Sequence, residues 1–152
     1  MTLLYLEDNE FLRRQTAKYL REDGYVVNDC RRIDQANQYL SIGGDVDCII
    51  TDLNMEDRWL GEYQKESEGC LLSGWVWLRR FVNIEDRFKN IPCIIYSGYL
   101  AELNSYLIRR GEASLIDEYH VYLVGKGGNN DHGYNALHDT LNKIFKDYND
   151  GR

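Results

Sequence analysis

The stretch that decides the fold is Asp47-Cys48-Ile49-Ile50-Thr51-Asp52, a short apolar run that ends on a carboxylate. A run of this length without alternating polar residues is typical of a strand buried on both faces. Strands of that kind occur in parallel sheets that helices cover from both sides. The sequence on either side of this stretch should then alternate between strands and helices.

The rest of the chain has that alternation. Further strands are predicted at 3–6, 25–27, 93–96 and 119–124, with an N-cap at Asn9 and glycine stops at Gly24 and Gly43. The segments between and after the strands have apolar residues at helical spacing: Leu12, Thr16, Tyr19 and Leu20; Ile33, Ala36 and Leu40; Val76, Leu78, Phe81 and Val82; Leu100, Leu103 and Leu107; and Leu137, Leu141, Ile144 and Tyr148. We therefore predict one α/β domain over residues 1–152, with a five-stranded parallel sheet and helices on both faces.

Composition narrows the class of protein. With 152 residues and 43% hydrophobic residues, the chain suits a single domain with its own core. The net charge of −7 argues against direct binding of nucleic acid, which needs a basic face. The N-terminus lacks the basic start of a signal peptide, and no apolar run is long enough to cross a bilayer, so a cytoplasmic protein without membrane contact is expected.

Cysteines and histidines give no sign of a zinc or disulfide site. The four cysteines form no C-x-x-C pair, which fits a reducing compartment. The three histidines, His120, His132 and His138, lack ligand spacing. Trp75 and Trp77 are expected to pack a helix rather than to read a nucleic-acid base.

Polar residues follow the predicted strands. Glu7 and Asp8 follow the first strand, Asp52 the third, Ser97 the fourth and Lys126 the fifth. Each alone has an ordinary explanation as a helix-end acid, a turn residue, a cap or a solvated lysine. Ligands in parallel α/β sheets bind at the carboxyl ends of the strands, so all five are expected on one rim. Clustered carboxylates suit Mg²⁺, an aspartate can form an acyl phosphate, and an ammonium and a hydroxyl can hold phosphoryl oxygens.

Together these residues resemble the receiver domains of bacterial two-component response regulators. The similarity covers about residues 2–148 and is carried by four stretches: Leu4-Tyr5-Leu6-Glu7-Asp8-Asn9-Glu10, Ile49-Ile50-Thr51-Asp52-Leu53-Asn54-Met55, Ile91-Pro92-Cys93-Ile94-Ile95-Tyr96-Ser97-Gly98, and Tyr122-Leu123-Val124 with Lys126. The resemblance implies a CheY-like, flavodoxin-like fold with strand order 2-1-3-4-5.

The resemblance also implies roles for single residues. Asp52 would accept the phosphoryl group, and Mg²⁺ would be bound by Asp8, Asp52 and the backbone carbonyl of Asn54, with Glu7 acting through water. Lys126 would bind the phosphate, Ser97 and Tyr122 would form the switch, and Asn54 and Tyr99 would set the dephosphorylation rate. Implied partners are a histidine kinase or phosphotransfer protein and a downstream protein target. The domain would catalyse only its own phosphoryl transfer and autodephosphorylation.

The sequence departs from the family at several places. The segment between Asp52 and Gly74, the glycine expected to open the third helix, is longer by roughly a dozen residues, and the spacing between Ser97 and Lys126 is enlarged through Glu112–Glu118. Met55 is followed by Glu56 instead of proline, Lys126 is followed by Gly127-Gly128, and an extra residue, Gly125, precedes Lys126. An unphosphorylated pseudo-receiver that serves as an interaction module is the alternative. A phosphatase of the haloacid-dehalogenase type is disfavoured because Asn54 stands where that class needs a second aspartate as general acid.

A long acidic segment from Glu56 to Ser73 separates Asp52 from the third helix. Loops of this length are either functional or disordered. Its aromatic and aliphatic residues allow two interpretations, an ordered flap that packs on the domain or a surface that borders the phosphorylation pocket and selects the kinase.

Overall fold

A computed structural model describes residues 1–127 and 133–150, with side chains through residue 147. The predictions for Gly128, His132 and the Tyr148 side chain lie outside this part of the chain. The sheet is made of β1 (Thr2–Leu6), β2 (Val26–Cys30), β3 (Cys48–Thr51), β4 (Cys93–Ser97) and β5 (Val121–Gly125). All neighbouring strands are parallel and their order is β2-β1-β3-β4-β5, which confirms the predicted fold.

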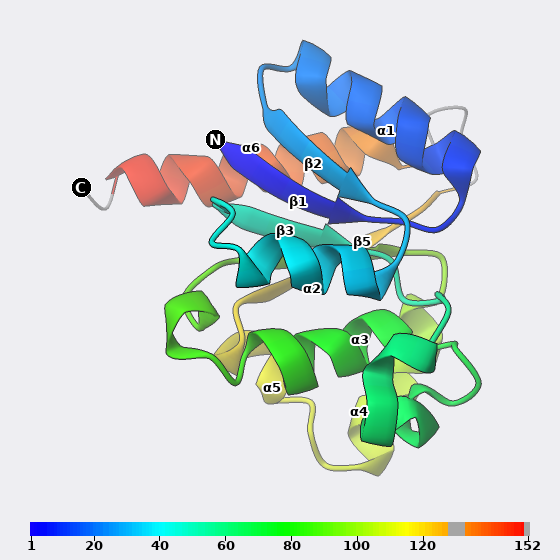
Figure 1. Cartoon of the computed structure of the whole chain (residues 1–152). Coiled ribbons are helices and arrows are strands. Elements are labelled where there is room, and N and C mark those ends of the chain that lie inside the picture. Colours follow the sequence, from blue (N-terminus) through cyan, green and yellow to red (C-terminus); the bar gives the residue numbers. More distant parts are fainter. Residues whose placement is uncertain (128–132, 151–152) are drawn as a thin grey trace.

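Helices cover both faces of the sheet (Figure 1). α1 (Glu10–Glu22) and α6 (Tyr134–Asp150) lie on one face. The other face carries α2 (Ile33–Ser41), α3 (Ser73–Trp77), α4 (Leu100–Arg109) and the short α5 (Leu115–Glu118). A π-helical turn, Leu78–Val82, prolongs α3, and a 3₁₀ turn, Asp86–Phe88, precedes β4. No helix in residues 1–127 or 133–150 is long and apolar enough to cross a membrane.

Side chains that alternate along each strand supply two separate cores. Leu3, Tyr5, Ile50 and Ile94 point toward α1 and α6, where they meet Leu137 and Leu141. Their neighbours point the other way, into the core under α2, α3 and α4. Burial of each such aliphatic side chain contributes about 1.5–3 kcal/mol, so both faces stabilise the same sheet. Trp75 and Trp77 are fully buried in the second core, as predicted.

Local signals explain where α1 begins and where it ends, and the edge position of β2 explains its composition. The Asn9 side chain accepts a hydrogen bond from the Leu12 amide (3.0 Å), and Gly24 has a φ of +96°, which favours glycine at a helix end. β2 continues to Cys30, beyond the predicted 25–27. Its later residues are polar because β2 is an edge strand, and Asp29 pairs there with arginines of α1.

The long segment after β3 is folded onto the domain. Residues Arg58–Ser67 form a 3₁₀ segment that is broken at Gly61, and Leu60 and Leu72 are fully buried. The Tyr63 ring meets Phe81 edge-on at 6.1 Å between centroids. The structure therefore has the packed flap. The role of this segment in choosing a kinase stays a prediction, to be checked by transfer rates from the cognate kinase to variants of its exposed acids.

Ion pairs fasten the same segment to its neighbours. Glu66 accepts two hydrogen bonds from Arg80, at 2.7 and 3.0 Å, and lies 3.9 Å from Arg110. Glu68 pairs with Arg109 of α4 at 3.3 Å. The Glu66–Arg80 pair is bidentate, which gives it better geometry than the usual surface pair. The segment is thus tied both to the π-helical turn after α3 and to the end of α4.

Gly74 explains how α3 approaches the end of β3. A Cβ atom at this position would lie 1.8 Å from the backbone oxygen of Asp52, a contact that no side chain can make without moving the backbone. The Gly74 amide also donates to the Leu53 carbonyl at 3.0 Å. Glycine at this position therefore allows α3 to pack directly against the backbone of Asp52.

We expect Gly74→Ala to destabilise the protein by about 3 kcal/mol, because overpacking against backbone has no flexible atom to relieve it. Gly98→Ala is the matched control, since a Cβ there meets nothing within 4 Å. Its stability should change by about 0.5 kcal/mol or less. Urea unfolding curves of the two variants give the comparison, and equal midpoints would contradict the proposed contact.

Candidate functional site

The carboxyl ends of four strands carry the predicted site residues, and Ser97 is the last residue of β4. Glu7 and Asp8 follow β1, Asp52 follows the adjacent β3, and Lys126 follows β5. The Asp52 amide extends the pairing by donating to the Leu6 carbonyl at 3.0 Å. Carboxylate oxygens of Glu7, Asp8 and Asp52 all lie within 4.8 Å of one another, so the predicted acidic cluster is present.

Lys126 crosses the rim to reach this cluster. Its Nζ donates to Oδ2 of Asp52 at 2.9 Å and also to Oε1 of Glu7. The Lys126 amide donates to the Ser97 carbonyl at 3.1 Å, so the backbone stays paired with β4 beyond the end of β5. These contacts place the ammonium between the carboxylates of two different strand ends.

Backbone amides hold the other oxygens of the two carboxylates. The Leu53 amide donates to Oδ1 of Asp52 at 2.7 Å, and the Asn9 amide donates to Oε2 of Glu7 at 3.2 Å. The Glu7 side chain is only 1% exposed, whereas Asp52 is 11% exposed and open to a partner. Both carboxyl groups are therefore fixed in orientation, and Asp52 is the more accessible of the two.

Charge and burial shift the pKa values in this cluster. Burial and, to a smaller degree, the nearby Asp52 raise the pKa of Glu7 to about 7, against the opposing effect of Lys126. Burial works against the charged form of Lys126, but Asp52 and Glu7 outweigh it and raise the pKa of the ammonium. Lys126 is thus protonated at neutral pH, and Glu7 changes charge near neutrality.

The donor set fits a hard divalent cation. Three carboxylates within reach of one another offer the oxygen ligands that Mg²⁺ and Ca²⁺ prefer. A cation would also relieve the burial of negative charge that raises the pKa of Glu7. This is the one cluster of possible metal ligands within residues 1–127 and 133–150. His138, which the sequence does not assign to a metal, lies 3.9 Å from Asp23.

Ser97 connects the rim to α4. Its side chain is fully buried, and its Oγ accepts a hydrogen bond from the Tyr99 amide at 3.1 Å, directly before α4 begins. Tyr99 itself is 40% exposed. A change in the hydrogen bond of Ser97 therefore acts on the first turn of α4.

The structure does not bring Tyr122 to Ser97, and the predicted pair is wrong. Tyr122 pairs with Ile94, three positions before the end of the strand pair, and packs on the side of α1 and α6. Alternation along β4 places Ser97 on the opposite face, with Ile95. Leu123, which is 41% exposed, is the β5 residue that pairs with Ile95 on that face.

The cause of this difference is the extra Gly125 before Lys126. One added residue between the lysine and the aromatic moves the aromatic to the other face of the strand, because side chains alternate with a period of two. That period, applied backward from Lys126, could have identified Leu123 from the sequence.

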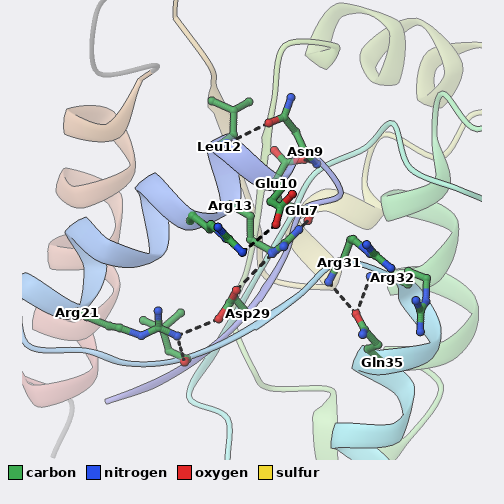
Figure 2. Close-up of polar contacts among 12 residues, drawn as sticks. Glu7, Asn9, Glu10, Leu12, Arg13, Arg21, Asp29, Arg31, Arg32 and Gln35 are labelled. Atoms are coloured by element: carbon green, nitrogen blue, oxygen red, sulfur yellow. Dashed lines mark hydrogen bonds and ion pairs between the residues drawn. The ribbon is translucent and has the colours of Figure 1, made fainter.

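Arg13 is a residue of this site that the sequence did not indicate. Its Nη1 donates to the backbone carbonyl of Glu7 at 3.1 Å, and its Nε donates to Asp29 at 3.3 Å (Figure 2). Arg21 reaches the same Asp29 from the next turns of α1 (2.9 Å). Arg13 is mostly buried and fastens α1 to the end of β1, where Glu7 and Asp8 are located. An arginine on an amphipathic helix gives no local sign of such a contact.

Comparison with known proteins supports the fold at low sequence identity. No protein-family model matches the sequence, and no curated protein matches it either. Among solved structures, the signal receiver domain of an HD domain-containing protein from Pseudomonas fluorescens Pf-5 has a TM-score of 0.65 and 14% identity, over 95% of this chain and 94% of that one. The chemotaxis response regulator CheY4 of Vibrio cholerae has a TM-score of 0.64 and 17% identity, over 94% and 97%.

A third similar structure was solved with bound Mg²⁺ and BeF. The response regulator TrrA from Thermotoga maritima, solved in complex with Mg²⁺ and BeF, has a TM-score of 0.57 and 19% identity, over 94% of this chain and 97% of that one. At these identities the likeness establishes the fold. The chain has the fold of a CheY-like receiver domain, as the sequence resemblance predicts.

We expect Lys126→Met to destabilise the protein by about 3 kcal/mol above neutral pH, since it leaves the buried Glu7 carboxylate without its counter-charge. Loss of the ammonium raises the pKa of Glu7 above the value of about 7 in the intact protein. A folded-state pKa raised above the unfolded value means that stability falls as pH rises through it, so the defect of the variant should grow with pH.

Two controls accompany this measurement by urea unfolding across pH. Lys18→Met removes a lysine whose side chain is 72% exposed and should leave stability nearly unchanged. Glu7→Gln combined with Lys126→Met should remove most of the added pH dependence. A defect of Lys126→Met that is the same at acidic and alkaline pH would contradict the assigned role of Glu7.

Proposed function

We propose that the chain is a phosphoacceptor domain of a two-component or phosphorelay system in the cytoplasm, phosphorylated on Asp52 with Mg²⁺ by a histidine kinase or phosphotransfer protein. One observation carries this proposal: a partly exposed aspartate bonded to a lysine ammonium within a cluster of three carboxylates. Phosphoryl transfer to a carboxylate needs an accessible oxygen, a cation site and a positive group for the phosphoryl oxygens.

In the proposed reaction an oxygen of Asp52 attacks the phosphorus atom of the donor. The new bond is an acyl phosphate, and the bond from phosphorus to the donor's imidazole nitrogen breaks, leaving the electron pair on that nitrogen. The Leu53 amide orients the Asp52 carboxylate through Oδ1. The Lys126 ammonium, already at Oδ2, is placed to stabilise the transferred phosphoryl oxygens.

Asp8, Asp52 and the Asn54 carbonyl, with Glu7 through water, would hold the Mg²⁺ ion. When bound, this ion neutralises charge on the phosphoryl group as it is transferred. Glu7 and Lys126 are hydrogen-bonded to each other, which keeps the ammonium at the cluster before the donor arrives. The domain needs no other catalytic group, because the remaining contribution to the rate comes from the orientation of the donor phosphoryl group toward Asp52.

The signal would leave the site through Ser97 and α4. If the Ser97 hydroxyl turns to donate to the phosphoryl group, the Tyr99 amide loses its present acceptor and the start of α4 must adjust. A protein target would then bind the altered surface of α4 and β5. Since Tyr122 faces the other side of the sheet, this transmission runs through the Ser97–Tyr99 contact and the neighbouring Leu123 instead.

The second candidate is an interaction module that is not phosphorylated. The position of Tyr122 on the opposite face from Ser97 favours it, because the aromatic half of the expected switch is missing. The intact carboxylate cluster and the Lys126–Asp52 contact favour the first candidate.

Acetyl phosphate with Mg²⁺ distinguishes the two candidates. We expect the intact protein to gain one phosphoryl group by intact-mass analysis, Asp52→Asn to gain none, and Asp8→Asn to react far more slowly because a cation ligand is lost. Asp45→Asn changes an exposed aspartate outside the cluster and is the control. An unmodified intact protein would support the interaction module.

The lifetime of the acyl phosphate is expected to depend on Asn54 and Tyr99, each two residues beyond a site residue. Tyr99 is bulky, and we expect it to hinder the in-line approach of water, so Tyr99→Ala should shorten the lifetime several-fold in a decay assay. Tyr122→Phe changes a tyrosine on the other face of the sheet and should leave the lifetime unchanged. Equal decay of Tyr99→Ala and the intact protein would rule out this role.

A further inference from the structure

We propose that Ser73 is a positioning residue for the cation site: its hydroxyl fixes the turn that presents the Asn54 carbonyl to Mg²⁺. This inference rests on the proposed function, because it assigns a role to Ser73 in the same phosphorylation site. Ser73 lies at the start of α3, outside the group of residues that would contact the ion.

The Ser73 side chain joins the two ends of the long segment. It is fully buried, and its Oγ lies 2.7 Å from the Met55 carbonyl and 2.9 Å from the Cys70 carbonyl. The hydroxyl has one hydrogen to donate, and the Met55 carbonyl is the nearer acceptor. The Met55 amide in turn donates to the Cys70 carbonyl at 3.3 Å, so the segment is closed at its base.

Two consecutive residues of α3 hold the backbone on both sides of Asn54. The Gly74 amide donates to the Leu53 carbonyl, and the Ser73 hydroxyl donates to the Met55 carbonyl. The Asn54 carbonyl between them accepts no hydrogen bond from the described residues. The turn is thus anchored through its outer carbonyls, and the middle one is left for a cation.

The length of the inserted segment makes this anchor necessary. Without a tie at its base, the chain after Asn54 would be free to sample many paths before it rejoins the fold at α3, and ordering it costs entropy. Cation affinity depends strongly on how well ligand atoms are oriented before binding, and loss of a residue that orients a ligand typically weakens binding about 10–100-fold. The contact between Ser73 and Met55 spans 18 positions of the chain and provides that orientation.

A second buried serine serves as a control that distinguishes a positioning role of Ser73 from a general effect on stability. Ser67 is also fully buried in the same segment, and its Oγ contacts Oδ2 of Asp57 (2.7 Å) and the Gln64 carbonyl (2.8 Å). It also accepts from the Cys70 amide at 3.2 Å. No hydrogen bond joins Ser67 to residues 52–55, so the same loss of a buried hydroxyl occurs there without a direct effect on the turn.

The experiment is a titration of the full chain with MgCl₂ by isothermal calorimetry, paired with urea unfolding. We expect both Ser73→Ala and Ser67→Ala to lower stability, since each leaves buried polar groups unpaired. Only Ser73→Ala should weaken Mg²⁺ binding, by about tenfold. Equal affinity of Ser73→Ala and the intact protein, or equal loss in both variants, would overturn the proposal.

A second variant and a check of the cation site itself complete the experiment. If Ser73→Ala fails to fold, Ser73→Cys keeps a similar shape with a weaker donor and should bind Mg²⁺ with reduced affinity; affinity equal to that of the intact protein would overturn the proposal. If the intact protein binds no Mg²⁺ and Asp8→Asn changes nothing, the proposed cation site itself fails. Binding by the intact protein with no effect of Ser73 variants would refute the positioning role alone.

Discussion

Carboxylates at the ends of adjacent strands repel one another, and the positive charge of Lys126 offsets that repulsion. The sheet order places Glu7 beside Asp52, and burial makes the charge on Glu7 costly, which raises its pKa to about 7. The ammonium of Lys126 reaches both groups from β5 at the edge of the sheet. This one interaction spans three strand ends, so the geometry of the site depends on the whole width of the sheet between β1 and β5.

Contacts outside the charged cluster hold this arrangement in place. Arg13 fastens α1 to the carbonyl of Glu7, and Gly74 allows α3 to lie against the carbonyl of Asp52. The inserted segment then adds a second layer, with Leu60 and Leu72 in the core and Glu66 paired to Arg80. A long segment directly after β3 and Asp52 would loosen the site if it were free, and here its base is tied by Ser73.

Much of the fold and of the acidic site could be predicted because the signals are local. Apolar runs of four or five residues mark the strands, and helical spacing marks the helices between them. The carboxyl ends of parallel strands meet at one rim, so Glu7, Asp8, Asp52 and Lys126 could be placed together without knowledge of side-chain positions. The register of Tyr122 was also open to a local argument, because the extra Gly125 is visible in the sequence and one added residue moves the aromatic to the other face of the strand.

By itself, the sequence determined that this chain folds as five alternating strand and helix units with acids and a lysine at the strand ends. Each of those features depends on residues close together in the chain. Only the tertiary structure decided that Arg13 would fasten β1, that the segment after Asp52 would pack on the core, and that Ser73 would meet Met55. These are contacts between elements distant in sequence, and their partners are fixed by helix packing and by the path of an irregular segment, for which no periodic pattern exists.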